Sequence, residues 1–324
     1  MRLLVLLTAL ACGTAPPPGA DLPDPRLARA ALSPTAARDA LRHLPPDQQF
    51  GAAFAYGEGV GAGSGLGEIV SRGQGLGPGL EAAYLDGAAH TWAPPQSVPP
   101  AEVARQIDRQ VPWDHRRSFH RGVVMSWTVA FRADPADVVP AARAYGELVG
   151  ELPLDGVRIG VQRALGHDLP TALDVAARYP AVWQPALVEE LGWRAGDDAE
   201  IWGAGLAALA ARVPDDQRCV FLHGAARGRV LRAPWATEAE AADLARQLEA
   251  RSAGCADAAW GGVAWALALT WDHRPHEMKR QACMLPKGPR ERALAHLDTL
   301  RGPGRGAPWE LSVGRSMPGG RRGP

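Results

Sequence analysis

Two copies of one tetrapeptide hold the residue types best suited to chemistry in this chain. Trp-Asp-His-Arg occurs at residues 113–116 and again at 271–274, and further histidine or cysteine residues follow each copy. Histidine and cysteine side chains are the usual protein ligands of zinc. The candidate metal ligands are therefore His115, His120, His273, His276 and Cys283.

These candidates lack the arrangement of a known type of metal site. His273 and His276 flank Pro275, no His-Glu-x-x-His motif occurs, and no fourth ligand is evident. We therefore assign no metal ligand. Each tetrapeptide is interpreted as a turn between helices, in which the tryptophan packs and the aspartate pairs with the arginine.

Other reactive groups lack the neighbours that catalysis needs. Ser64 and Ser126 stand in no Gly-x-Ser-x-Gly elbow, which disfavours acyl transfer. The carboxylates at 189–190 and at 197–198 are adjacent in sequence, so on a helix they point in different directions and suit solvation or a cap. The glycine-rich stretch 57–79 holds neither Gly-x-Gly-x-x-Gly nor a Lys-Ser/Thr pair, so it disfavours a phosphate-binding loop. We predict no catalytic residue and no cofactor.

Tryptophan is the remaining candidate for recognition. The chain has 11 tryptophans, which is more than its overall composition would suggest. Several of them lie near expected helix boundaries. Such side chains can anchor a peptide or a sugar on a concave surface, although core packing is the expected fate of most of them. The residues concerned are Trp113, Trp127, Trp183, Trp193, Trp202, Trp260 and Trp265.

An internal repeat would position all of these groups. A glycine recurs at intervals of 30, 35, 38, 32, 32 and 37 residues, and a proline usually lies 7 to 12 residues before it. A period in this range is typical of stacked helix pairs, because one pair cannot bury its apolar face alone. The glycines are Gly57, Gly87, Gly122, Gly160, Gly192, Gly224 and Gly261.

Apolar residues between the glycines follow the helical period. Thr237 and Glu240 have the spacing of a capping box, which starts a helix. Glycines four apart, as at 57 and 61, 192 and 196, and 224 and 228, would let a neighbouring backbone approach, although a helix end is the favoured reading of Gly196. The expected buried faces are Val138, Ala141, Ala142, Tyr145, Leu148 and Val149; Ile201, Ala204, Gly205, Ala208 and Leu209; and Ala241, Leu244, Ala245 and Leu248.

One segment resembles the tetratricopeptide and Sel1-type repeats. Leu191-Gly192, Gly196-Asp197, the small residues of 204–211 and Pro214-Asp215 follow the order of that repeat, and His223-Gly224 with Gly228 echoes it. The resemblance implies an all-α fold: an α-solenoid of stacked helix-turn-helix repeats in a tetratricopeptide-like superhelix. We expect about six helix pairs within residues 26–301, and we carry over no ligand contact.

The two ends of the chain differ from the middle. Residues 1–11 have a basic start and a short apolar run, as in an export signal, and Cys12 follows Ala9-Leu10-Ala11 in a pattern that resembles the bacterial lipoprotein box. Residues 12–25 are rich in proline and glycine and are predicted to be a flexible tether. Residues 302–324 are predicted to be a disordered basic tail.

Charge and cysteine content narrow the class of protein. The 35 basic and 35 acidic residues cancel, which argues against nucleic acid as a partner. Of the remaining cysteines, Cys219 and Cys255 lie at comparable places in successive repeats, so a disulfide between them is conceivable, although buried thiols are the favoured prediction.

We therefore predict an exported, lipid-anchored scaffold that binds a protein or peptide without catalysis. The membrane contact would be a lipid on Cys12, and the location would be the cell envelope, in the outer membrane or periplasm. One alternative is a metal-dependent or glycan-acting periplasmic enzyme that uses His115, His273 and His276. Another is a purely structural envelope lipoprotein.

Overall fold

The computed structural model describes residues 33–95, 97–151, 153–252, 254–271 and 275–300. These residues form 16 α-helices with a 3-10 turn and a π turn between them, and no strand occurs in these ranges. The prediction of an all-α fold is confirmed. The predicted signal at 1–11, the lipidation site Cys12 with its tether, and the tail at 302–324 lie outside the described residues.

The chain divides into two compact units, and the boundary falls within helix α10. Unit 1 comprises residues up to 131 together with 136–160, and unit 2 comprises residues 132–135 and those from 161 onward. Of the helices that the structure describes, none is both long enough and apolar enough to cross a bilayer.

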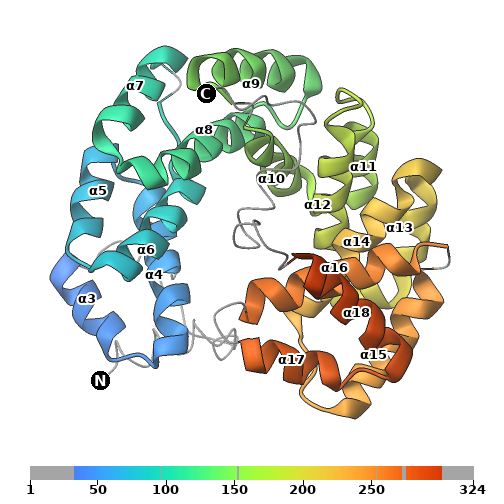
Figure 1. Ribbon diagram of the computed structural model, residues 1–324. Helices are drawn as coiled ribbons and strands as arrows, with labels where there is room; N and C mark the ends of the chain where they lie inside the picture. The colour runs from blue at the N-terminus through green and yellow to red at the C-terminus, as the bar shows by residue number, and fades with distance from the viewer. Residues whose placement is uncertain (1–32, 96, 152, 253, 272–274, 301–324) are drawn as a thin grey trace, which may run out of the picture. The chain divides into compact units, whose positions relative to one another are not determined.

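Unit 1 is built from helices that alternate between two layers. In Figure 1, α4, α6 and α8 form one layer, and α3, α5 and α7 form a second layer beside it. The elements are α3 (Pro34–Arg42), α4 (Pro46–Gly61), α5 (Leu66–Gln74), α6 (Pro78–Thr91), α7 (Pro100–Gln110), the 3-10 turn η1 (Trp113–His115), α8 (Arg116–Ala130), α9 (Pro135–Val149) and α10 (Leu154–Leu165).

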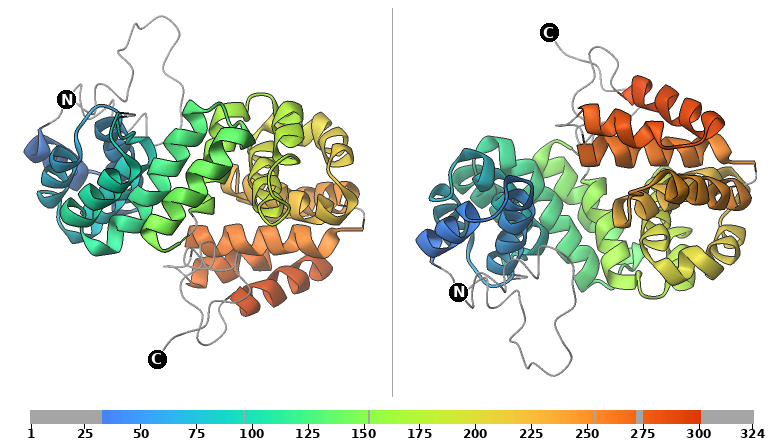
Figure 2. Two further views of the ribbon diagram at one scale, coloured as in Figure 1. Left: turned by 90° about the horizontal axis from the view of Figure 1, so that it is seen from above. Right: turned by 90° about the horizontal axis from the view of Figure 1, so that it is seen from below.

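Unit 2 repeats the alternation. Its most extensive contacts join α12 to α14 and α14 to α16, followed by α16 to α18. Figure 2 shows α16 and α18, in orange and red, side by side in both views. The elements are α11 (Leu169–Ala176), α12 (Gln184–Asp197), the π turn η2 (Ile201–Gly205), α13 (Leu206–Arg212), α14 (Asp215–Arg232), α15 (Glu238–Arg251), α16 (Ala256–Trp271), α17 (Pro275–Cys283) and α18 (Lys287–Leu300).

The repeat glycines all lie on even-numbered helices, which we call the even layer of each unit. A methyl group at Gly57 in α4 would collide with the Tyr84 carbonyl oxygen of α6, and a methyl at Gly87 in α6 would collide with the Phe54 carbonyl of α4. Gly61 likewise faces the Ala88 carbonyl. Partner numbers rise together along α4 and α6, so the two helices run parallel with their backbones in contact.

Unit 2 has the same arrangement between α12 and α14. Added methyl groups at Gly192 and Gly196 would meet the Phe221 and Ala225 carbonyls, and those at Gly224 and Gly228 would meet the carbonyls of Glu189 and Trp193. The spacing of four residues therefore does permit close backbone approach, as predicted. The reading of Gly196 as a helix end is wrong, because Gly196 lies inside α12 and its missing side chain admits the Ala225 carbonyl.

The last repeat glycine has a different role. A methyl at Gly261 would meet only histidine rings, 3.4 Å from His223 and 3.5 Å from His296, whereas its neighbour Gly262 faces the His223 carbonyl. In α16 the close approach has thus moved by one residue. A side-chain methyl at Gly261 would make only ordinary van der Waals contact with the two imidazoles.

Prolines and caps set where the helices begin. Pro45 and Pro214 are the residues just before α4 and α14, and Pro153 precedes α10, so the prolines mark the starts of glycine-bearing helices. The Thr237 hydroxyl accepts from the Glu240 amide at 3.2 Å, and Glu240 Oε2 accepts from the Ala236 amide at 2.7 Å. The predicted capping box is present, with the glutamate reaching one residue further back than usual.

Buried faces follow the sequence pattern except where helix geometry changes. All four predicted residues of α15 are buried. In α9, Val138, Ala142 and Tyr145 are buried as predicted, but Leu148 is 51% exposed. The prediction for 201–209 is wrong apart from Leu209: the buried residues there are Trp202, Leu206, Leu209 and Ala210. The π turn η2 explains this, because its wider i to i+5 bonding rotates the residues that follow.

Two further predictions need correction. Pairing each odd-numbered helix with the even one that follows gives eight pairs in the described residues, instead of about six. Cys219 and Cys255 form a disulfide, so the favoured prediction of two thiols is wrong. The bond ties the second turn of α14 to the residue that precedes α16.

A matched pair of substitutions in α4 tests the close approach. Gly57→Ala should lower the free energy of unfolding by about 1–3 kcal/mol, because α4 and α6 must separate. Gly51→Ala in the same helix, where no atom lies within 4 Å of the added methyl, should be neutral or raise stability by up to about 1 kcal/mol. Urea denaturation of each variant measures both changes. Equal effects at the two positions would contradict the packing described.

Candidate functional site

A buried arginine joins three helices of the even layer in unit 2. Arg227 of α14 is 5% exposed, and its Nη1 lies 2.9 Å from Glu189 Oε1 while its Nη2 lies 3.5 Å from Glu190 Oε2 on α12. Its guanidinium also stacks 4.8 Å from the ring centre of Trp265 on α16. A buried guanidinium needs such partners, because an uncompensated charge in the interior is costly. We call Glu189, Glu190, His223, Arg227 and Trp265 the Arg227 cluster.

A row of paired polar groups extends from this cluster across the layer. His223 Nδ1 lies 3.2 Å from Glu189 Oε1, and His296 Nε2 on α18 lies 3.1 Å from Asp257 Oδ1 on α16. The two imidazoles flank Gly261. His223, Trp193, Trp265 and His296 are all partly exposed, so the row is accessible to a partner molecule.

The chemistry of this row suits binding. Each histidine has a carboxylate beside it, which orients the ring, and the tryptophans offer flat apolar surface next to hydrogen-bonding groups. In the described residues, no serine or cysteine makes a hydrogen bond or ion pair with His223 or His296, so neither is placed to activate a nucleophile there. The row therefore combines paired polar groups with flat apolar surface.

The first Trp-Asp-His-Arg copy forms a second polar cluster, in unit 1. It lies on η1 between α7 and α8, so the prediction of an inter-helix turn is correct. The packing prediction is wrong, because Trp113 is 81% exposed. The pairing prediction is also wrong: Asp114 Oδ2 lies 3.6 Å from His115, while Arg116 donates to the Val111 carbonyl and faces Asp108.

Asp86 holds this second cluster to the even layer. Its Oδ1 accepts a 2.6 Å hydrogen bond from the Ser118 hydroxyl and lies 4.0 Å from His115 Nδ1. Interaction with Asp86, and the nearby charge of Asp114, raise the pKa of His115. Burial opposes ionisation of Asp86, but its hydrogen bonds to His115 and Ser118 lower the pKa of the carboxyl below its ordinary value. The charged forms of both groups are favoured.

Within the described residues, the candidate metal ligands do not lie together. His120 bonds Tyr145 through Nδ1 at 2.8 Å and faces Asp108, whereas His115 faces Asp86. His276 and Cys283 lie on α17, and His273 lies outside the described residues. Within the described ranges, no three His, Cys, Asp or Glu side chains are grouped as metal ligands would be.

Other sequence-predicted groups take structural positions. Ser126 donates to the Val123 carbonyl of its own helix, and the stretch 57–79 lies largely in α4 and α5. Asp198 accepts from the amides of residues 200 and 201, which is the capping role predicted for it. The prediction that 189–190 is a solvated pair is wrong, because Glu190 is 7% exposed and both carboxylates face Arg227.

The tryptophans divide between core and surface. Trp183, Trp202 and Trp260 are buried, which matches the expectation for most of them. Trp127, Trp193 and Trp265 are partly exposed. Two that lie on unit 2, Trp193 and Trp265, are on the even-layer helices that flank α14, namely α12 and α16.

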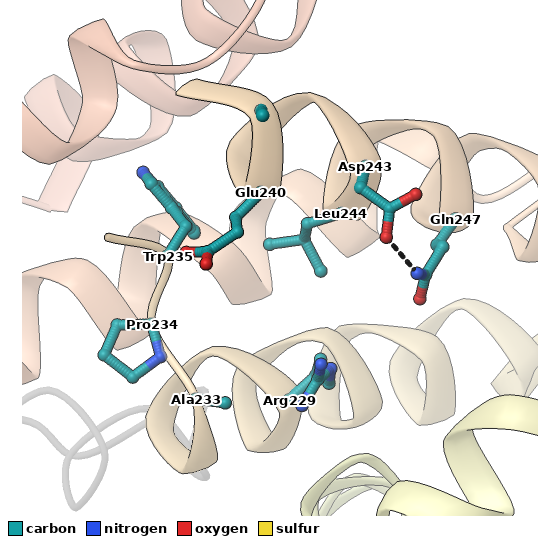
Figure 3. Close-up of a pocket in the computed structure, with 9 residues that line it drawn as sticks. Arg229, Ala233, Pro234, Trp235, Glu240, Asp243, Leu244 and Gln247 are labelled. Atoms are coloured by element: carbon teal, nitrogen blue, oxygen red, sulfur yellow. Dashed lines mark hydrogen bonds between the residues drawn. The ribbon is translucent and has the colours of Figure 1, made fainter. Parts of the chain in front are cut away.

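A pocket of about 540 Å³ lies apart from the even-layer row, between the end of α14 and α15. Figure 3 shows Arg229 rising from α14 on one side and Glu240 and Asp243 projecting from α15 on the other. Pro234 and Trp235 of the connecting segment close one end, and Leu244 supplies an apolar wall. No sequence motif marks any of these residues as a site.

Removal of the central arginine should destabilise unit 2. Arg227→Met keeps most of the side-chain volume but removes the guanidinium that two carboxylates share, so we expect a loss of about 3–5 kcal/mol in the free energy of unfolding. Arg212→Met removes an exposed pair with Asp174 and should cost no more than about 1 kcal/mol. Chemical denaturation compares the two. A small, equal loss would show that Arg227 does not join the helices.

The His115 cluster predicts a defined pH dependence. Its raised pKa means that protonated His115 stabilises the fold; this contribution is complete below the ordinary value of about 6.5 and disappears as pH rises through the folded-state pKa. Asp86→Asn should therefore lower the pKa of His115 in an NMR titration and destabilise the protein more at acidic than at alkaline pH. His120, whose pKa burial lowers, should shift little. An unchanged His115 pKa in the variant contradicts the assignment.

Comparison with known proteins adds no relative. No family model matches the chain, and no curated protein or solved structure does so either. What the protein does must therefore be inferred from its own residues.

Proposed function

We propose that this chain is an exported, lipid-anchored scaffold of the cell envelope that binds a protein or peptide on its even layer without catalysis. Its helix pairs would stack within each unit as an α-solenoid of the tetratricopeptide kind. The observation that carries the proposal is the accessible row on α12, α14, α16 and α18, where paired histidines alternate with tryptophans.

Parallel stacking supports a role in binding extended partners. Consecutive even helices contact one another along their glycine faces, so each repeat adds a strip of side chains to the same surface. Aromatic residues next to charged groups are the composition of interaction hot spots. A segment of protein laid across the helices could engage several strips at once.

The disulfide supports export. Cys219 and Cys255 are bonded, and such bonds persist in oxidising compartments and are rare in the cytosol. A periplasmic location fits this bond and the apolar run before Cys12. Lipid attachment at Cys12 would hold the folded part beside the membrane.

Site-specific photocrosslinking tests the binding surface. A photoreactive phenylalanine analogue at Trp193, on the even layer, should trap a discrete protein in intact bacterial cells that express the full chain. The same analogue at Arg246, an exposed residue of α15, is the matched control and should trap none. No adduct at Trp193, or the same adducts from both positions, would contradict the proposed surface.

The anchor has a separate test. Radiolabelled palmitate should enter the full-length protein and be absent from a Cys12→Ser variant. Cys283→Ser, which removes an exposed free thiol, should leave labelling unchanged. Incorporation that survives Cys12→Ser would remove the anchor from the proposal and leave the binding surface untouched.

A further inference from the structure

We propose that the pocket between α14 and α15 binds a small zwitterion with an apolar side chain, of the size of a dipeptide. This site would be independent of the even-layer surface. Its lining residues are Arg229, Ala233, Pro234, Trp235, Ala239, Glu240, Asp243, Leu244 and Gln247, around a volume of about 540 Å³. Pockets of 300–1,000 Å³ are typical of small-molecule sites.

Arg229 is the residue of the pocket that most directly indicates a ligand. Its side chain is partly exposed in the pocket, and within the described part of the chain its guanidinium has no hydrogen-bond or ion-pair partner. A guanidinium presents parallel N–H groups that match a carboxylate, so an anionic group in the pocket would satisfy it.

The other polar groups of the lining are already held in place. Glu240 accepts from the Ala236 amide at 2.7 Å, and Asp243 accepts from Gln247 at 2.6 Å and from Arg246 at 3.0 Å. The side-chain oxygen of Gln247 in turn accepts a hydrogen bond of 2.7 Å from the indole nitrogen of Trp202. These bonds fix the wall opposite Arg229. A carboxylate has about four acceptor sites, so Glu240 and Asp243 both keep capacity for a further donor.

The charges of the pocket select the class of ligand. Arg229 favours an anionic group, but Glu240 and Asp243 oppose a polyanion such as phosphate and favour a cation on their own side. In a molecule with one carboxylate and one ammonium group, the carboxylate would pair with Arg229 and the ammonium group with Glu240 and Asp243. Leu244 lies beside these charged groups and supplies an apolar contact for an aliphatic side chain.

Trp235 fixes the closed end of the pocket. It is 4% exposed, and its indole nitrogen donates to the Gln281 carbonyl on α17 at 3.0 Å. The segment between α14 and α15 is therefore tied to a third helix. A wall held in this way is ready to bind before a ligand arrives, which lowers the entropic cost of association.

Calorimetric titration of the folded wild-type protein with L-leucyl-L-leucine tests the proposal without any substitution. The dipeptide should bind, whereas N-acetyl-L-leucyl-L-leucine, L-leucyl-L-leucinamide and inorganic phosphate should bind at least about tenfold more weakly, since each lacks one of the two matched charges or adds a repelled one. No binding of the dipeptide at millimolar concentration would overturn the proposal. Equal binding of the acetylated form would also overturn it, because the ammonium group would then be irrelevant.

Substitutions locate the binding. Arg229→Gln and Asp243→Asn should each weaken dipeptide binding by about 10- to 100-fold. Arg232→Gln, an exposed arginine at the end of the same helix, should leave it unchanged. Circular dichroism checks that each variant is folded. If Arg229→Gln does not fold, Arg229→Lys replaces it, because lysine keeps the positive charge but lacks the paired N–H groups of the guanidinium. Binding that is unaffected by all the pocket variants would place the dipeptide elsewhere and overturn the assignment.

Discussion

Backbone contact between parallel helices is the constraint on which the rest of this structure depends. Glycines on α4 and α6, and on α12 and α14, face carbonyl oxygens of the neighbouring helix in both directions, so any side chain there would force the pair apart. A glycine inside a helix costs about 1 kcal/mol relative to alanine. Close packing, with Cα–H groups directed at carbonyls, offsets that cost.

This contact determines where functional groups lie. Because α12 and α14 touch, Arg227 reaches both carboxylates of α12 while it stacks on Trp265 of α16. One arginine thus ties three helices at the place where accessible histidines and tryptophans gather. Cys219–Cys255 reinforces the same region by linking α14 to the start of α16. The surface proposed for binding is therefore also a well-connected part of unit 2.

The glycine contacts, the helix starts and the helix cap were predictable from sequence because each depends on residues that are close together in the chain. Glycine spacing, the prolines before α4 and α14, and the cap at Thr237 all follow from short patterns. The Arg227 cluster could have been found by placing His223 and Arg227, which are four apart, on one face of a helix beside Glu189. The buried face after the π turn η2 and the Arg229 pocket were not predictable, since they depend on a change in helical pitch and on how one connecting segment docks.

The most direct test of the central claim is a double-mutant cycle with Gly192→Ala and Gly224→Ala, measured by chemical denaturation. Each glycine faces a carbonyl of the other helix, so either substitution should separate α12 from α14. The account predicts that each costs stability alone and that the second costs less once the first is present, with a coupling of about 0.5 kcal/mol or more. Additive effects, or the gain in stability normal for alanine in a helix, would contradict it.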